Sequence, residues 1–345
     1  MASPLQPGGF PMSAVSSKDI DILKEDIQIK IDKYFQKAAY RVKYTIRNEQ
    51  AGVRIPLLFQ ARDYYNYFRV WLDGKRVELK EIDYLLTDTV RFNQFSNNFK
   101  HTANSVNNAI EIPYDKQIKR SFPLSDFRYF EVNLSKGTHQ ILVEYTGKVW
   151  IDHSGWLNEY SFRYFLAPAK EWKSFHELNV YVDASAFDQS IHSNLSSPDS
   201  GSFKGTAYWK FSEIPADYIQ ITFSPKPNAF AKFLISIGPL IIAIVFILLI
   251  LIMHISLIRY TRKKALDLLA RSVIILGSLI FPLFILLSFG FAYEWIDYTI
   301  GTYAGRHQGG YIFILIYLYI FLMPLYWIGM NRIGLNYKKR FAAKS

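Results

Sequence analysis

The sequence contains no cysteine, which excludes disulfide bonds, thiolate zinc sites and cysteine nucleophiles. Its seven histidines are scattered and form no HxH or HExxH spacing. No metal site is therefore predicted. Glycine-rich loops of the GxGxxG and GxxxxGK[ST] types, which bind dinucleotides and phosphates, are also absent. The sequence thus predicts neither a metal nor a cofactor.

Charged residues are missing from three long apolar stretches in the last third of the chain. The first, Phe233–Ile258, has 26 residues without a formal charge. A helix of this length is about 39 Å long, which exceeds the ~30 Å hydrocarbon thickness of a bilayer. Together the stretches predict transmembrane helices at about 233–258, 272–293 and 310–330. Because ion and proton pathways usually need charged groups, a transporter acting alone is not expected.

Positive charge is concentrated in this apolar part of the chain. Residues 1–230 contain 28 Lys and Arg against 26 Asp and Glu, a net charge of +2, whereas residues 231–345 have 12 against 3, a net charge of +9. Because nucleic-acid binding would place the positive charge on the larger soluble part, no nucleic-acid partner is predicted. The lipid bilayer is the expected partner of residues 231–345.

The positions of the basic residues also predict an orientation. Arg259–Arg271 contains five Lys and Arg, the chain after residue 330 contains another five, and residues 294–309 contain only Arg306. Lys and Arg are enriched on the cytoplasmic side of membrane proteins. We therefore expect a multi-pass protein of the cell (inner) membrane, with a periplasmic or extracellular N-terminal part and a cytoplasmic C-terminus.

Before residue 230 the dominant pattern is alternation of apolar and polar residues. Tyr40, Val42, Tyr44 and Ile46 alternate with polar residues, as half-buried strands do. Short strands separated by turns predict an all-β domain, antiparallel and β-sandwich-like, at 25–228, after a flexible segment at 1–24 and before a membrane domain at 229–345. A break in the alternation allows two sandwiches with a boundary near 147–160.

One β-hairpin is predicted in more detail. Tyr67–Leu72 and Lys75–Leu79 are strand-like and are separated by Asp73 and Gly74. Asp-Gly suits a two-residue hairpin turn, since both of its residues need a positive φ. We therefore expect a tight turn at this position.

The first 17 residues are rich in Pro, Gly and Ser and do not form a signal peptide. A predicted outside domain of some 230 residues must nevertheless cross the membrane. We therefore expect the precursor to begin upstream with a signal peptide that is removed. The lack of cysteine and the abundance of Lys, Ile, Asn, Tyr and Phe favour a bacterial source.

Candidate site residues are few. Aromatic residues make up 17% of the chain, and four that flank turns or loops are candidates for contacting a partner: Phe95, Phe99, Tyr64 and Tyr65. Asp152-His153-Ser154 is not a predicted catalytic site, because adjacent strand residues face opposite ways and triads are assembled from distant positions. No catalytic residue is predicted.

Small residues and prolines mark possible packing positions in the predicted helices. Ser288 and Ala292 are four residues apart, as in small-xxx-small helix contacts. Each predicted span also contains one proline, namely Pro239, Pro282 and Pro324. These prolines either shape a packed bundle or a lipid-facing groove, or are simply tolerated, as prolines often are in membrane helices.

Three functions fit these patterns. The first is an accessory or assembly protein of the bacterial cell envelope, whose β domain binds another envelope component or a partner membrane subunit. The second is a membrane-anchored extracytoplasmic hydrolase acting on polysaccharide or peptide, which would need paired carboxylates in a cleft. The third is a subunit of a transporter or channel complex.

Overall fold

A computed structural model describes residues 2–4, 20–49, 53–61, 63–80, 100–104, 107–115, 118–123, 127–166, 174–306 and 312–343. The chain divides into two compact units. The β unit consists of Met1–Ile151 and Glu159–Ser224, and the helical unit consists of Asp152–Asn158 and Pro225–Ser345. The short segment Asp152–Asn158 therefore belongs with the helices, although it lies between two strands of the β unit.

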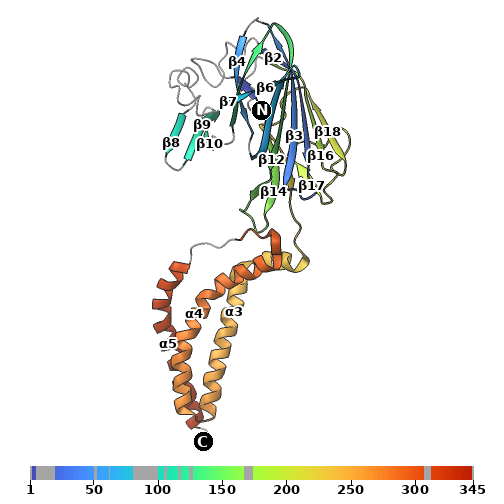
Figure 1. The fold of residues 1–345 in the computed structure, drawn as a ribbon. Coiled ribbons are helices and arrows are strands. Elements are labelled where there is room, and N and C mark those ends of the chain that lie inside the picture. Colours follow the sequence, from blue (N-terminus) through green and yellow to red (C-terminus); the bar gives the residue numbers. More distant parts are fainter. Residues whose placement is uncertain are drawn as a thin grey trace. The chain divides into compact units, whose positions relative to one another are not determined.

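The largest sheet of the β unit contains the long strands β2, β3 and β12 (Figure 1). Burial alternates along β3 and β12. Its central strands β3 and β12 pair over their whole lengths, so that directly opposite residues face the same side. Tyr40, Val42, Tyr44 and Ile46 of β3 point inward, as their alternation predicts. The sheet comprises, in order, β18 (Thr206–Phe211), β16 (Leu178–Asp183), β2 (Ile20–Ile31), β3 (Lys37–Asn48), β12 (Gly137–Lys148), β5 (Tyr64–Leu72) and β6 (Lys75–Val77), with β15 (Ser174–Phe175) beside β2.

This sheet is mixed, so the predicted antiparallel, all-β sandwich is wrong. β2 pairs in parallel with both β16 and β15, and Leu178 lies opposite Glu25. Alternating burial does not distinguish parallel from antiparallel neighbours, and the antiparallel prediction came from the short turns between sequence neighbours. The parallel pairs join segments about 150 residues apart, which no turn pattern reveals. The main strand also begins at Ile20, five residues before the expected start of the domain.

Among the described residues, three smaller sheets complete the β unit. The first contains β1 (Ala2–Pro4), β4 (Val53–Gln60), β11 (Phe127–Leu134) and β7 (Leu79–Lys80). The second contains β10 (Ile118–Pro123), β9 (Asn107–Asp115) and β8 (Lys100–Asn104). The third contains β13 (Trp150–Asp152), β14 (Glu159–Phe165), β19 (Tyr218–Phe223) and β17 (Ile191–Ser193).

Aromatic side chains fill the core where these sheets meet the large one. Phe59 of β4 packs edge-on against Tyr145 of β12, with ring centroids 5.7 Å apart. Tyr40 of β3 stacks on Tyr145 at 4.5 Å and lies 6.3 Å from Tyr164 of β14. All four rings are nearly inaccessible to solvent. The high aromatic content therefore serves largely to build this core.

The predicted hairpin at Asp73-Gly74 is confirmed. β5 and β6 pair in an antiparallel register in which Leu72 faces Lys75. Asp73 has a φ of 49° and Gly74 a φ of 80°, as a two-residue turn with two positive φ values requires.

The helical unit contains α3 (Ala229–Lys263), α4 (Asp267–Ile300), the short 3-10 helix η3 (Gly301–Tyr303) and α5 (Ile312–Ala342). Among the described residues, two helical segments are long and apolar enough to cross a membrane: Ala229–Lys263 and Asp267–Tyr303. The prediction of three transmembrane helices is therefore corrected to two. In the described part of α5, Tyr317, Tyr319 and Tyr326 interrupt the apolar run with polar hydroxyls.

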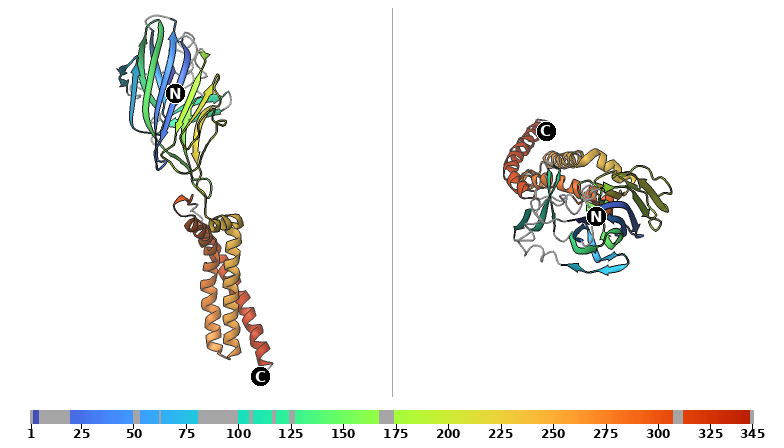
Figure 2. Two further views of the ribbon diagram at one scale, coloured as in Figure 1. Left: turned by 90° about the vertical axis from the view of Figure 1, so that its right-hand side faces the viewer. Right: turned by 90° about the horizontal axis from the view of Figure 1, so that it is seen from above.

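The two apolar helices lie side by side in both views (Figures 1 and 2). α3 bends where Gly238 leaves the helical conformation with a φ of 73°, just before Pro239. Proline inside a helix removes one backbone hydrogen bond and clashes with the preceding turn. The part of α3 after the bend, Pro239–Lys263, is still about 37 Å long, which is enough to cross a bilayer.

Candidate functional site

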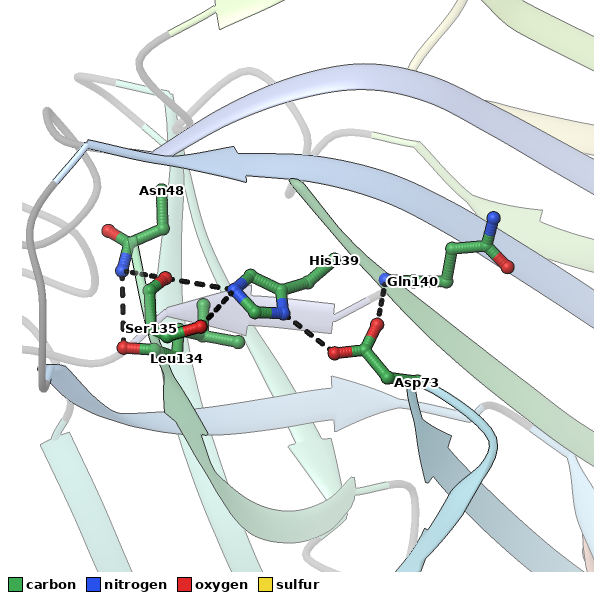
Figure 3. Close-up of polar contacts among 6 residues, drawn as sticks. All are labelled: Asn48, Asp73, Leu134, Ser135, His139 and Gln140. Atoms are coloured by element: carbon green, nitrogen blue, oxygen red, sulfur yellow. Dashed lines mark hydrogen bonds and ion pairs between the residues drawn. The ribbon is translucent and has the colours of Figure 1, made fainter. Parts of the chain in front are cut away.

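A polar cluster of the β unit joins three turns or strand ends around His139 (Figure 3). Asp73 lies in the β5–β6 turn, Ser135 in the β11–β12 turn and His139 at the start of β12. Asn48, at the end of β3, donates to the backbone carbonyls of Leu134 and Ser135 at 3.3 and 3.1 Å. The pairing of β5 with β12 thus brings Asp73 and His139, which are 66 positions apart, into contact.

His139 bonds to both sides of this cluster. Its Nδ1 lies 2.7 Å from Asp73 Oδ2, and its Nε2 lies 2.8 Å from the carbonyl oxygen of Ser135. Asp73 Oδ1 also accepts the backbone N–H of Gln140 at 2.8 Å. A carboxylate and a carbonyl are both acceptors, so both ring nitrogens donate when His139 is charged. Figure 3 shows the ring lying between these two acceptors.

The electrostatics of the cluster favour the charged pair. Burial lowers the pKa of His139, but the bonds to Asp73 and to the Ser135 carbonyl outweigh it, and the pKa is raised overall. Burial acts to raise the pKa of Asp73, but the bonds from His139 and the Gln140 N–H lower it overall. His139 is only 8% exposed and clamps two neighbouring turns together.

The same atoms are arranged in the order of a catalytic triad. Ser135 Oγ lies 3.3 Å from Nε2 of His139, whose Nδ1 faces Asp73. A general base needs a free Nε2 lone pair. In this geometry Nε2 is closer to the Ser135 carbonyl, at 2.8 Å, than to the hydroxyl. Catalysis would therefore require Nε2 to leave the carbonyl and accept the hydroxyl proton. Sequence reasoning missed this cluster, because no motif links Asp73 to His139.

A second buried polar group lies inside the core. Glu25 of β2 is fully buried, and Tyr164 donates to its Oε1 at 2.9 Å. Tyr44 lies 2.8 Å from the Tyr164 hydroxyl and extends this network. Glu25 Oε2 has no hydrogen-bond partner among the described residues. Burial raises the pKa of Glu25 to about 7, because the charged form loses its hydration.

The two described candidates for contacting a partner, Tyr64 and Tyr65, lie on opposite faces of β5. Tyr64 lies opposite Gly147 and faces inward, where its ring contacts Arg128 at 4.0 Å. Tyr65 lies opposite Thr146 and faces outward, between two lysines. Adjacent strand residues point to opposite faces, so the two tyrosines do not form one surface. Phe95 and Phe99 lie outside the described residues.

The proposed packing residues of the helical unit lie at different places in it. Ser288 and Ala292 are both buried, and Ala292 packs in an apolar cluster with Leu234, Ile242 and Ala243 of α3. Pro239 follows the bend of α3, whereas Pro282 and Pro324 lie inside α4 and α5. A groove of about 550 Å³ between α3 and α4 is lined by residues that include Phe246, Phe284, Ser288, Phe291, Glu294 and Trp295.

The segment Asp152–Asn158 forms a backbone connection with the chain after α4. Asn158 donates its backbone N–H to Tyr303 and its side-chain N–H to Ala304, at 2.8 and 3.1 Å. Gly305 donates to the carbonyl of Trp156 at 3.0 Å, and the Trp156 ring stacks on Tyr293 at 5.3 Å. The Asp152-His153-Ser154 triplet is part of this connection, and its histidine bonds to Asn158 at 2.7 Å.

Within the described part of the chain, no group of three or more His, Asp or Glu side chains is close enough to hold a metal ion. The seven histidines include a second buried one, His254 of α3, whose Nδ1 lies 2.9 Å from the Tyr326 hydroxyl. Its Nε2 donates to the Val273 carbonyl at 3.2 Å. This histidine therefore bonds all three helices together.

No protein-family model and no curated protein matches this chain. Among solved structures, native yeast leukotriene A4 hydrolase aligns with 61% of this chain and 31% of its own, at 8% identity and a TM-score of 0.35. An M1 zinc metallopeptidase from Deinococcus radiodurans aligns with 59% of this chain and 42% of its own, at 13% identity and a TM-score of 0.29. This chain thus spans less than half the length of either protein, and likeness at these values establishes neither its fold nor its activity.

Proposed function

We propose that this chain is a membrane-anchored binding protein of the bacterial cell envelope, with its β unit outside the cytoplasm. Two helices with the length and apolarity of membrane spans support the anchoring. Arg262 and Lys263 in the last turn of α3 and Lys264 directly after it are basic, and basic residues favour the cytoplasmic side. In the chain, the β unit precedes the N-terminal end of α3, whereas these basic residues lie at its C-terminal end. The β unit is therefore assigned to the outside.

The outer face of the large sheet is the observation that supports a binding role. On strands β2, β16 and β18 this face is crossed by ion pairs, such as Lys30 with Asp183 at 3.7 Å and Lys210 with Glu177 at 2.9 Å. On β3 and β12, Lys37, Lys43 and Lys148 have no carboxylate within 4 Å among the described residues. This half of the face therefore carries uncompensated positive charge.

Tyrosines accompany these lysines. Tyr65 lies between two of them, and Tyr67 of β5 is 37% exposed, with the Arg69 guanidinium 5.2 Å from its ring. Tyrosine and arginine are enriched in the residues that dominate binding energy at protein interfaces. An acidic surface of a partner envelope protein fits this face by charge, and its apolar contacts would centre on Tyr67.

Affinity purification of the full chain in mild detergent tests this role. A partner retained by the wild-type protein is expected to be lost from a Tyr67→Ala, Lys43→Glu variant, because one change removes the apolar anchor and the other reverses the local charge. Lys136→Glu makes the same charge change on an exposed turn and is expected to retain the partner. Equal retention by all three proteins, or by none, would contradict a binding role of this face.

A hydrolase is the second candidate, and the order Ser135–His139–Asp73 is the observation that favours it. The full chain would be assayed against peptide and polysaccharide substrates. Activity that disappears in Ser135→Ala, while the melting temperature is unchanged, would support a nucleophilic serine. Activity equal to that of the wild-type protein in this variant would exclude the serine, and the cluster would then be only a clamp between turns.

A further inference from the structure

Two lysines of the large sheet are placed where their charges repel each other. Lys37 of β3 and Lys148 of β12 are directly opposite partners in the antiparallel register, and both side chains are exposed on the outer face. Like charges directly opposite each other destabilise a sheet. The ring of Tyr65 lies beside both ammonium groups, with Nζ-to-centroid distances of 5.0 Å for Lys37 and 4.2 Å for Lys148.

The nearby carboxylates are engaged elsewhere. Asp32 Oδ1 accepts the backbone N–H groups of Gln36 and Lys37, at 2.7 and 3.2 Å. Asp63 Oδ2 pairs with the guanidinium of Arg163 at 2.9 Å. Neither lysine has a carboxylate oxygen within 4 Å among the described residues, so the aromatic ring is the main group that compensates their charge. An anion bound between the two ammonium groups would relieve the repulsion.

The position of the pair along the chain indicates where that anion comes from. Only residues 149–151 separate Lys148 from Asp152, the first residue of the segment that belongs to the helical unit. Extended chain rises about 3.4 Å per residue, so this tether is at most about 14 Å long. Within the helical unit, the segment bonds to residues 303–305, directly after the second candidate span. Along the chain, the pair is therefore only a few residues from a segment of the unit that contains both candidate spans.

We propose that Lys37, Tyr65 and Lys148 form a binding site for the phosphate group of anionic phospholipid headgroups. Lysine binds phosphate as a point charge, and basic residues close to a membrane are attracted to its anionic lipids. Tyrosine is enriched at the membrane–water interface, where one side of the ring is apolar and its hydroxyl is hydrated. This lipid contact goes beyond the partner protein proposed above, and it rests on the membrane anchoring proposed there.

Lysine acetylation rates, measured by mass spectrometry on the full chain in nanodiscs, test the site. Lys37 and Lys148 are expected to react ~5-fold more slowly with phosphatidylglycerol present than in phosphatidylcholine alone, since each contact favours the bound, protected amine. Lys43, on the same strand and face, is the internal control and is expected to react equally in both. Equal rates for Lys37 and Lys148 in the two nanodiscs would overturn the proposal.

A second experiment distinguishes binding of a lipid phosphate from binding of free phosphate. Inorganic phosphate added to phosphatidylcholine nanodiscs is expected to leave both rates unchanged at physiological ionic strength. If free phosphate protects the lysines as well as phosphatidylglycerol does, the lipid assignment is overturned.

A charge-reversal variant keeps the test independent of folding. Lys37→Glu would place a carboxylate opposite Lys148 and form a cross-strand ion pair, so the variant is expected to melt no lower than the wild-type protein. Lys148 in this variant is expected to react at the same rate in both nanodiscs. Lys136→Glu makes the same charge change outside the site and is expected to retain the effect of phosphatidylglycerol on Lys148. Continued lipid protection of Lys148 in Lys37→Glu would count against the site.

Discussion

The two units of this protein differ in the interactions that stabilise each of them internally. The β unit buries large aromatic side chains, among them Trp209 and Tyr145, which are essentially inaccessible. In the helical unit many large apolar side chains are exposed, for example Leu268 at 82% and Tyr298 at 86%. In lipid, exposure of apolar groups has no hydrophobic cost, so helices associate through close packing and polar contacts. Removal of a large side chain should therefore affect the β unit more, and added bulk at a helix contact should affect the helical unit more.

The largest expected effect is the loss of a core tryptophan in the β unit. Trp209 is fully buried, and its Nε1 donates to the Ser196 carbonyl at 2.7 Å. Trp209→Ala should destabilise the β unit by about 3–5 kcal/mol, because it leaves a cavity and an unpaired carbonyl. Urea unfolding of the full chain in detergent, followed by β-sheet circular dichroism, would measure this loss.

Trp295→Ala is the matched change in the helical unit. Trp295 is 41% exposed on α4, and its loss should alter unfolding by less than about 1 kcal/mol. If the two tryptophan variants lowered the free energy of unfolding equally, removal of a large side chain would not affect the β unit more than the helical unit.

The next effect is the contribution of Glu25 to the pH dependence of the free energy of unfolding. Its pKa is raised to about 7 in the folded state from an ordinary value of 4.5, so the folded state binds the proton more tightly. The resulting stability is fully present below the unfolded pKa and is lost as pH rises through the folded pKa. Between pH 4.5 and 8 the loss should be on the order of 3 kcal/mol. Unfolding measured across this range would show it.

Glu25→Gln is the control, since its amide does not titrate. The Glu25 contribution to the pH dependence should be absent from this variant, while the other titrating groups act equally in both proteins. Identical pH profiles of the two proteins would mean that Glu25 keeps an ordinary pKa in the core.

The smallest effect tests close packing in the helical unit. A Cβ added at Gly277 of α4 would overlap Nε2 of His254, whose Nδ1 is bonded to the Tyr326 hydroxyl. Gly277→Ala should therefore destabilise the helical unit by about 1–3 kcal/mol, through overpacking. Gly290→Ala on the same helix meets no atom within 4 Å and should be neutral or slightly stabilising. Thermal unfolding of both variants in detergent would compare them.

The sequence predicted local features of the fold better than contacts between distant segments. Alternation placed the inward residues of β3 correctly, and Asp73-Gly74 specified its turn, because both depend on neighbours in the chain. The parallel pairing of β2 with β16 and the contact of His139 with Asp73 depend on register between distant strands. Periodicity contains no information on that register, so both were missed. Apolar length alone likewise predicted three spans, whereas two helical segments among the described residues are long and apolar enough.

The segment Asp152–Asn158 has a consequence for the order in which the chain is made. Synthesis proceeds from the N-terminus, so this segment is synthesised about 145 residues before its partners Tyr303 and Ala304. Strands on both sides of it can pair while it still waits for both candidate spans to be translated. The hydrogen bonds of this segment to residues 303–305 therefore form late, after both candidate spans have been synthesised.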